Sequence, residues 1–296
     1  MIATHKNSGT AGLAGKKPSF FRKETALRQS PGKNLRIIPL GGLEEIGRNM
    51  TIFEYGNDIV IVDCGLMFPE EEMMGIDYII PNTEYLEKNK DKIRGVIITH
   101  GHFDHIGAIP HILPRIGNPP IYATELTRGM ILKRQEDFKD QPALNVKVVR
   151  KIDRLALGNF KIEFFHVNHS IPDSVGLAIR TPVGMIIHTG DFKFDHSPIS
   201  DVPADISKIA RLGAEGVLAL MSDSTSSQTE GYSVSESKIR ENMDQLFSKS
   251  RGRIITATFS SLISRVQQIA ELAEKHGRKV AVDGYSMRNN VEIARQ

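Results

Sequence analysis

The 296-residue sequence predicts an α/β protein in two parts. Residues 35–221 contain short alternating or wholly apolar runs, typical of strands, separated by turns rich in Gly, Asn or Asp. From about residue 222, helical and strand patterns alternate, which favours a parallel sheet. A third observation links the fold to chemistry. The stretch "ITHGHFDHIGAIP" places three histidines and an aspartate directly after an apolar run.

Residues 1–34 are expected to be a flexible basic arm. They hold seven basic residues and one acidic residue, are rich in Gly, Ser, Thr and Lys, and show no helical periodicity. Because the net charge of the chain is +3, the remainder is mildly acidic. The arm lacks the apolar stretch of a secretory signal. Polyanion binding, a solubilising tail and a transit peptide remain as alternative uses.

Three strands are expected first, in the runs "LRIIPL", "MTIFEYG" and "DIVIVDCG", and the Gly-rich and Asn-Asp turns between them predict antiparallel pairing. The run "RGVIITH" predicts a buried strand that leads into the histidine cluster. "HIGAIPHILPRI" predicts a helix that Pro114 ends or kinks. A strand at "PIYAT" and a helix with Thr124 as N-cap follow. "NFKIEFFHVNHS", "SVGLAIRTPVGMIIHTGDF" and "GVLALMSDST" predict further strands, the last of them buried.

The alternation beyond residue 222 begins with helix "SESKIRENMDQLFSK", capped by Ser235, and strand "RIITATF". Helix "LISRVQQIAELAEKHG" with Gly277 as C-cap, strand "KVAVDG" and a helix from about Ser286 follow. The last helix has no C-terminal stop signal, so we expect the chain to be incomplete. Cys64 is the only cysteine, which excludes an intrachain disulfide, fits a cytoplasmic location and leaves nitrogen and oxygen as metal ligands.

The histidine cluster predicts a metal site. His100 and His102 are two residues apart in an extended loop, so their side chains point the same way and can bind one ion. Asp104 and His105 follow at the start of the helix and can face a second ion, because neighbouring helical side chains diverge by about 100°. Other strand ends must complete both sites, since zinc takes about four ligands.

The best further candidates are His169 and Asp191, each just past a predicted strand. A carboxylate at Asp191 can bridge two cations about 3.5 to 4 Å apart. Asp63 ends the third strand and is expected to orient the histidine loop through hydrogen bonds, with His188 in a similar supporting role. His166 competes with His169, but three positions earlier on a strand it should face the other side of the sheet.

These motifs resemble those of the metallo-β-lactamase-fold hydrolases. "THGHFDH" matches the HxHxDH motif of that family, and Asp63, His169 and Asp191 match its other early motifs in order. Three stretches are similar to the ribonuclease J branch, in which a β-CASP domain is inserted: "GGLEEIGRNM", "DCGLMFPEEEMMGIDYIIPN" and "HSIPDSVGLAIRTPVGMIIHTGDFKFD". The resemblance covers residues 35–296.

The resemblance implies an αββα sandwich over residues 35–221 and an incomplete, Rossmann-like β-CASP domain over residues 222–296. It places two Zn²⁺ ions, with Mn²⁺ or Mg²⁺ as alternatives, on six residues: His100, His102, Asp104, His105, His169 and Asp191. Asp104 and His105 are the implied catalytic residues, with Asp104 orienting the attacking water and accepting a proton. A structural Ca²⁺ near Gly75 and Asp77, and RNA contacts at Ser260 and Ser261, are also implied.

The implied activity is hydrolysis of RNA phosphodiesters, by a 5′-to-3′ exonuclease with endonuclease action, in rRNA maturation and mRNA decay. RNA is the implied partner, full-length members form homodimers or homotetramers, and no membrane partner is expected. The chain departs from the family pattern at Phe103, where an acidic residue is usual, and at Leu262 and Ser264, where Asn and His are common. A last histidine ligand and a phosphate-binding Ser-Gly-His stretch belong beyond residue 296, so this chain alone is expected to have reduced activity or none.

Two other functions fit the same motifs. Paired metals also serve thioester hydrolysis, so a small-molecule thioesterase of the glyoxalase II kind is one alternative, although the appended C-terminal segment argues against it. The other alternative is an inactive RNA-binding or scaffold fragment. Such a scaffold has no reason to retain six metal ligands.

Overall fold

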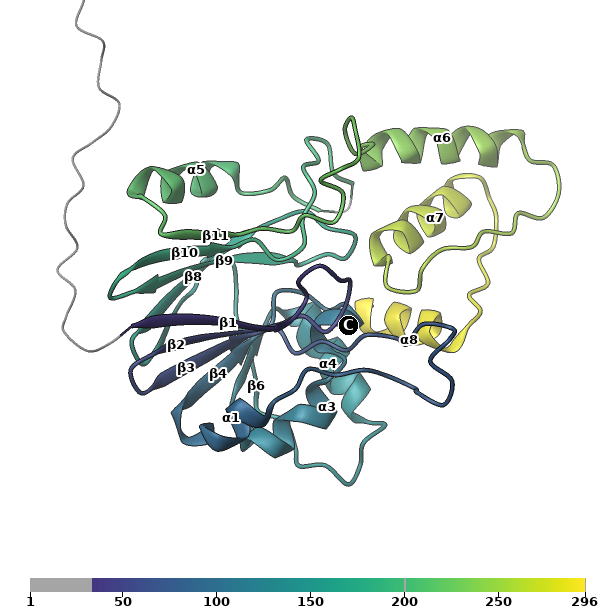
Figure 1. Ribbon diagram of the computed structural model, residues 1–296. Coiled ribbons are helices and arrows are strands. Elements are labelled where there is room, and N and C mark those ends of the chain that lie inside the picture. Colours follow the sequence, from purple (N-terminus) through teal and green to yellow (C-terminus); the bar gives the residue numbers. More distant parts are fainter. Residues whose placement is uncertain (1–33, 200, 296) are drawn as a thin grey trace, which may run out of the picture. The chain divides into compact units, whose positions relative to one another are not determined.

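The computed structural model describes residues 34–199 and 201–295, and residues 1–33 of the predicted arm lie outside them. Two β-sheets are stacked face to face (Figure 1). The first contains, in this order, β1 (Leu35–Gly41), β2 (Met50–Tyr55), β3 (Asp58–Val62), β4 (Ile93–Ile97), β5 (Ile121–Ala123) and β6 (Val146–Val148). The second has the order β11 (Ala219–Met221), β10 (Gly184–His188), β9 (Val175–Thr181), β8 (Phe160–His166) and β7 (Arg154–Leu157).

Strands β1 to β3 pair antiparallel, as the turn residues between them predict, whereas β3 to β6 pair parallel. In the second sheet β7 to β10 are antiparallel and β11 is parallel to β10. The connections of the parallel strands contain α1 (Glu84–Lys88), α2 (Phe103–Ile106), α3 (Ile109–Ile112), α4 (Glu125–Gln135) and two 3₁₀ turns, η1 (Lys90–Lys92) and η2 (Leu113–Ile116). The predicted helix after the histidine cluster is therefore divided, and Pro114 lies in η2.

The alternation of side chains along β3 assigns them to two layers of the core. Ile59 and Ile61 pack with the helices of the first sheet, whereas Val60 and Val62 pack against the second sheet. Because both faces are covered, this strand is a continuous apolar run in the sequence. Helix α5 (Ile206–Glu215) covers the outer face of the second sheet through Leu212. The layers follow the order helix, sheet, sheet, helix, which confirms the predicted αββα sandwich.

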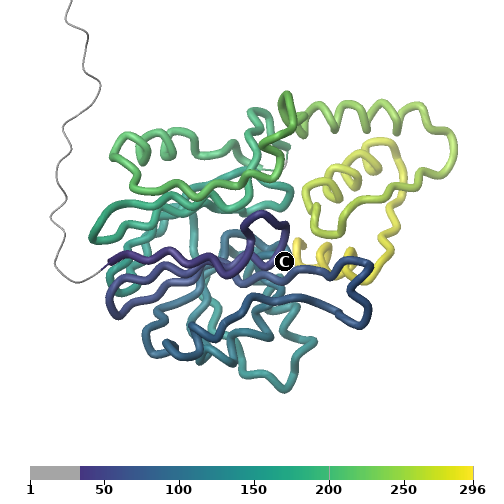
Figure 2. The backbone as a smooth tube through the Cα atoms, viewed as in Figure 1, coloured from purple at the N-terminus to yellow at the C-terminus, as the bar shows by residue number. Residues whose placement is uncertain are grey.

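Three helices form the C-terminal part: α6 (Glu236–Lys249), α7 (Ile263–Lys275) and α8 (Tyr285–Ala294). Ser235 caps α6, because its Oγ accepts the N–H of Ser237 at 3.3 Å. Gly277 follows α7 with φ 64°, the left-handed conformation that favours glycine at a helix end. Figure 2 shows the chain returning through α8, which contacts α4.

The two strands predicted between these helices are not formed. Residues 253–259 and 279–284 have no strand pairing in the described part of the chain. Ile255 and Phe259 remain 89% and 82% exposed. Strand β11 also differs from its prediction, since it is an edge strand with Leu220 65% exposed. Apolar alternation indicates which side chains share a face, but a strand also needs a neighbour for its N–H and C=O groups.

The loop after β11 is where we predict the second domain to begin, and that boundary remains a prediction. Within residues 34–199 and 201–295, none of the helices has the length and apolar character needed to span a bilayer. Cys64 is a free and buried thiol in the loop after β3.

The one-turn helix α2 is held by its carbonyl groups. Those of its first three residues accept hydrogen bonds of 2.8 to 3.2 Å from backbone N–H groups of neighbouring loops, namely Asn49, Cys64 and Leu66. Gly65 lies within this contact. A Cβ atom added at Gly65 would lie only 1.5 Å from the carbonyl oxygen of Asp104.

Gly65→Ala is therefore expected to displace α2 and to lower the free energy of unfolding by about 1 to 3 kcal/mol, because a packed backbone contact must open. Gly213→Ala is the control, since a Cβ there meets nothing within 4 Å and alanine is the better helix former. Urea unfolding followed by circular dichroism measures both. Equal stability of the two variants would contradict this account of α2.

Candidate metal centre

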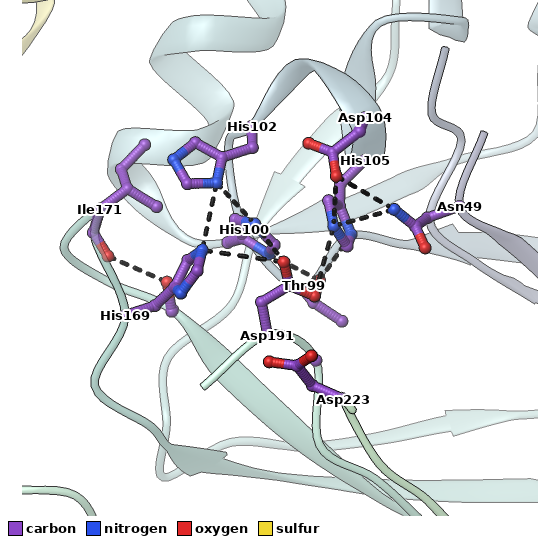
Figure 3. Close-up of polar contacts among 12 residues, drawn as sticks. Asn49, Thr99, His100, His102, Asp104, His105, His169, Ile171, Asp191 and Asp223 are labelled. Carbon is purple, nitrogen blue, oxygen red and sulfur yellow. Dashed lines mark hydrogen bonds and ion pairs between the residues drawn. The ribbon is translucent and has the colours of Figure 1, made fainter. Parts of the chain in front are cut away.

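Loops after β4, β8 and β10 bring the six predicted ligands together (Figure 3). The first sheet supplies four of them from the loop after β4 and from α2: His100, His102, Asp104 and His105. The second sheet supplies His169 after β8 and Asp191 after β10. Each ligand follows the C-terminal end of a strand, so stacking of the two sheets gathers all of them at one edge.

Three imidazole nitrogens form the first group of ligand atoms. Nδ1 of His102 lies 3.0 Å from Nε2 of His100 and 3.2 Å from Nε2 of His169. Two nitrogens bound at about 2.05 Å to one tetrahedral zinc ion lie roughly 3.3 Å apart. The observed spacing therefore fits a single ion.

His105 and two carboxylates form the second group. Nε2 of His105 lies 3.3 Å from Oδ2 of Asp104 and 3.5 Å from Oδ1 of Asp191. Oδ2 of Asp191 faces the first group, 3.9 Å from Nε2 of His100 and 3.8 Å from Nε2 of His169. The carboxylate of Asp191 thus reaches both groups, as a bridging ligand must.

Hydrogen bonds determine which histidine nitrogens keep a lone pair. Nδ1 of His105 lies 2.8 Å from Oδ2 of Asp63, and an ionised carboxylate only accepts, so Nδ1 carries the proton. The hydroxyl of Thr99 donates to Oδ2 of Asp63 at 3.0 Å. It must therefore accept from Nδ1 of His100, 3.1 Å away. In the neutral imidazoles both Nε2 atoms consequently carry the lone pair that faces the centre, as metal ligands require, and on His105 a bound cation would take the place of a second proton.

The contacts of Asp63 are those that its expected orienting role requires. Asp63 is buried, with a left-handed φ of 63° that aspartate tolerates better than most residues. Its Oδ1 accepts the backbone N–H of Thr99 at 2.8 Å, which connects the end of β3 to the histidine loop.

Sequence reasoning missed Thr99 and Asn49. Nδ2 of Asn49 donates to Oδ2 of Asp104 at 3.2 Å and lies 3.1 Å from Nε2 of His105. Both missed residues are polar and border an apolar strand, Thr99 after β4 and Asn49 before β2. That position at a strand end is the signal that points to them.

The loop of Asp191 is supported by its backbone. Nδ1 of His188 accepts the N–H of Gly190 at 3.1 Å, so this histidine supports the loop without contacting a ligand atom. Asp223, which the sequence did not single out, accepts the N–H of Phe192 at 3.4 Å. Both contacts flank Asp191 in the chain.

Charge within the centre favours a cation. Burial lowers the pKa of His100 well below 6.5 and that of His102 to about 4. Burial acts in the same direction on His105, but the charge of Asp63 and hydrogen bonds with Asp104 and Asp191 raise its pKa well above 6.5. Burial would raise the pKa of Asp191, yet His105 lowers it to about 2. The carboxylates thus remain ionised and draw positive charge towards Nε2 of His105.

The predicted calcium position does not join this centre. Gly75 and Asp77 lie in an exposed segment after β3. Among residues 34–199 and 201–295, two groups of three or more His, Cys, Asp or Glu side chains could share an ion. Neither group includes Asp77. The calcium site remains a prediction without support from a side-chain cluster.

A cavity of about 810 Å³ lies beside the centre. Its lining includes His102 and Asp104 from the ligand set, and also Ser260 and Ser261 from the C-terminal part. The two serines that we predict to contact RNA therefore face the same space as two predicted metal ligands. Their contact with RNA remains a prediction.

A polar cluster holds the loop that carries His169. Nδ2 of the buried Asn168 donates to the carbonyl of Val202 at 2.8 Å and to Oδ2 of Asp201 at 3.1 Å. Nε2 of His166 lies 3.0 Å from the same carbonyl and 3.3 Å from Oδ1 of Asp201. His166 thus makes its polar contacts with Val202 and Asp201 and not with the ligand atoms.

The ion pair of His166 and Asp201 should stabilise the fold over a limited pH range. Burial lowers the pKa of His166, but the hydrogen bond and charge of Asp201 raise it above 6.5. Burial raises the pKa of Asp201, but His166 lowers it below 3.8. The histidine contribution is complete below pH 6.5 and is lost as the pH rises through the folded-state pKa. The aspartate contribution is present above pH 3.8 and is lost as the pH falls through its folded-state pKa.

We therefore expect Asp201→Asn to lower Tm most near pH 5.5, where both groups are charged in the folded protein, and less near pH 8.5. Thermal unfolding of the wild type and the variant at both pH values measures the difference. An equal loss of Tm at the two values would show that the ion pair does not contribute as described.

Known families match both parts of the chain. The metallo-beta-lactamase superfamily matches residues 43–242, and the beta-CASP domain of ribonuclease J matches residues 251–296. Ribonuclease J of Thermus thermophilus is 44% identical over 270 residues, which are 89% of this chain and 47% of that protein. A ribonuclease J of Helicobacter pylori is 45% identical over 264 residues, 89% of this chain and 38% of that protein. The chain thus spans less than half the length of either relative.

A solved structure supports the fold alone. The crystal structure of a protein of unknown function from Enterococcus faecalis V583 has a TM-score of 0.63 at 18% identity, and the match covers 88% of this chain and 67% of that one. The αββα sandwich, the order of the histidine and aspartate motifs and the two family matches agree with one another. The chain belongs to the metallo-beta-lactamase superfamily, in the ribonuclease J branch that carries a beta-CASP domain.

Proposed function

We propose that this chain contains the metal centre of a ribonuclease that hydrolyses RNA phosphodiesters. The carrying observation is a pair of adjoining ligand groups, His100 with His102 and His169, and His100 with His105 and Asp191. They lie beside a cavity lined by Ser260 and Ser261. The relatives named ribonuclease J support RNA as the substrate. The finer proposal is a 5′-to-3′ exonuclease with endonuclease action, in rRNA maturation and mRNA decay.

The donor set fits two zinc ions, because imidazole nitrogen and carboxylate oxygen are ligands that zinc prefers, and manganese accepts the same set. We assign one ion to the nitrogens of His100, His102 and His169, the other to Asp104 and His105, and the carboxylate of Asp191 to both. When bound, the ions supply Lewis acidity, which makes water a nucleophile near neutral pH and offsets charge on phosphoryl oxygens.

Asp104 is the residue that we assign to proton transfer. Its Oδ2 accepts from Asn49 at 3.2 Å and lies 3.3 Å from Nε2 of His105, so its plane is held from two sides. Its Oδ1 has no hydrogen-bond partner among residues 34–199 and 201–295, and the residue lines the cavity. Asp104 can therefore orient the attacking water and take its proton.

The setting of the enzyme is part of the same proposal. We propose a cytoplasmic location, since the only cysteine is a free thiol. We also propose RNA as the partner, which the relatives named ribonuclease J support. Assembly as a homodimer or homotetramer remains a prediction from the family resemblance.

Metal affinity tests the ligand assignment and the role of Thr99. Thr99→Val keeps the shape of the side chain but removes the hydroxyl that connects Asp63 to His100, so we expect zinc to bind about 10 to 100-fold more weakly. Thr127→Val is the matched control, because its buried hydroxyl contacts Thr124 instead of a ligand. Competition with a chromogenic chelator measures both. Unchanged affinity in Thr99→Val would remove Thr99 from the support of the centre.

Cleavage of a single-stranded RNA with a 5′-monophosphate tests the function. We expect cleavage that depends on Zn²⁺ or Mn²⁺ and is slow in this chain, because the family resemblance places further site residues beyond residue 296. Asp104→Asn should lower it about 100-fold or more, since an amide can neither orient water as a carboxylate nor accept its proton. Asp140→Asn, an exposed carboxylate, is the control for the loss of one negative charge. Labels at the 5′ and 3′ ends distinguish single nucleotides released from the 5′ end from internal cuts.

Each alternative function has its own outcome in this assay. Hydrolysis of a glutathione thioester without RNA cleavage would replace the ribonuclease by a thioesterase. RNA binding without zinc uptake would indicate a non-catalytic fragment. Equal turnover in Asp104→Asn and the wild type would refute the role given to Asp104.

A further inference from the structure

Arg134 lies in the last turn of α4 and lines the same cavity as His102 and Asp104. The side chain lies between two aromatic rings. Its guanidinium carbon is 4.8 Å from the centroid of Phe103 and 5.3 Å from the centroid of Phe138. A guanidinium group that stacks on aromatic rings has a fixed plane, and its N–H donors point outwards in that plane.

Arg134 forms no ion pair within 4 Å in the described part of the chain. The charge of Asp137, three residues further along the chain, acts on its guanidinium from a greater distance, and its Nε is buried without a hydrogen bond. Other cations of the same helix are paired, Arg128 with Glu125 at 3.6 Å and Lys133 with Glu136 at 2.9 Å. Partial burial of a cation without a hydrogen-bond acceptor costs free energy, so an anionic ligand would bind favourably at this position.

The position of this cation selects the ligand. The cavity is also lined by Asp104, the proton acceptor of the proposed reaction, and by Ser260 and Ser261. A nucleic-acid strand that brings one phosphodiester to the metal centre must place its neighbouring phosphates along this wall. A planar guanidinium with several donors matches the oxygens of a phosphate group.

We propose that Arg134 binds a phosphate of the RNA strand adjacent to the one that is cleaved, and that Phe103 positions its guanidinium for this contact. This inference rests on the proposed ribonuclease function. Phe103 has a second effect, because an apolar ring at this position cannot form an ion pair with Arg134. An acidic side chain at position 103 would lie against the guanidinium and compete with the phosphate.

The experiment measures how binding of a fluorescein-labelled single-stranded RNA depends on salt, by fluorescence anisotropy in EDTA, where metal-dependent cleavage does not occur. Each phosphate contact on a single strand adds about 0.7 to the slope of log K against log salt concentration. Arg134→Met should therefore lower the slope by about 0.7 and weaken binding about fivefold at 0.1 M salt. Arg128→Met removes one positive charge from the same helix and should leave the slope unchanged.

Phe103→Glu provides a second variant that keeps Arg134 in the chain. Its carboxylate should pair with the guanidinium and lower the slope, whereas Phe103→Leu, which has no charge, should retain most of it. Circular dichroism establishes that each variant is folded. If Arg134→Met does not fold, the comparison of Phe103→Glu with Phe103→Leu decides the question.

The outcomes separate this inference from the function on which it rests. If the wild type binds RNA and the slopes of Arg134→Met and Arg128→Met are equal, the inference is wrong and the ribonuclease proposal stands. Equal slopes for Phe103→Glu and Phe103→Leu would overturn the inference in the same way. If the wild type does not bind single-stranded RNA, both proposals fail.

Discussion

A buried carboxylate, that of Asp63, holds the candidate metal centre together. It accepts the backbone N–H of Thr99 and Nδ1–H of His105, each at 2.8 Å, and so connects the end of β3 to the histidine loop and to α2. A carboxylate buried to this degree depends on such donors, because a buried charge without partners costs several kcal/mol. The same bonds direct Nε2 of His105 towards Asp104 and Asp191. The hydrogen bonds that stabilise the buried carboxylate of Asp63 are therefore the same bonds that orient the ligands.

The stacked sheets set the separation between the two parts of the centre. Ligands after β4 belong to the first sheet, and His169 and Asp191 follow strands of the second. Large side chains such as Phe53 and Phe164 fill the space between the sheets, and a close-packed interior does not deform easily. A backbone hydrogen bond of 2.8 Å from Lys193 to Asn168 also connects the loops of Asp191 and His169. The ligand distances thus follow from core packing as well as from the loops.

The wall of the cavity shows how one side chain changes the chemistry beside such a centre. Phe103 occupies the position between His102 and Asp104 where the family resemblance leads us to expect an acidic residue. Its ring contacts Arg134 and lies 6.4 Å from the ring of Phe68. The metal ligands are unaffected, since they are the residues on either side. Phe103 in place of an acidic residue instead removes a negative charge from the wall of the cavity beside Arg134.

Local pattern was sufficient for much of this protein. Short apolar runs predict the strands of both sheets except β6 and β7, which the sequence pattern did not identify. The spacing of His100, His102, Asp104 and His105 predicts two directions of ligand atoms, because it depends only on neighbours in the chain. Residues 253–259 show the limit of this reasoning. They alternate as a strand should, but a strand exists only where another strand supplies hydrogen-bond partners.

By itself, the sequence determined the order and chemical type of the metal ligands and the apolar faces of the sandwich. Only the tertiary structure decided which residues support those ligands. Thr99 contacts Asp63 across 36 positions, and Asn49 contacts Asp104 across 55. It also decided that Arg134 lies beside two rings and forms no ion pair within 4 Å in the described part of the chain. The physical reason is that periodicity is a local property, whereas hydrogen-bond partners and burial arise from packing between distant segments.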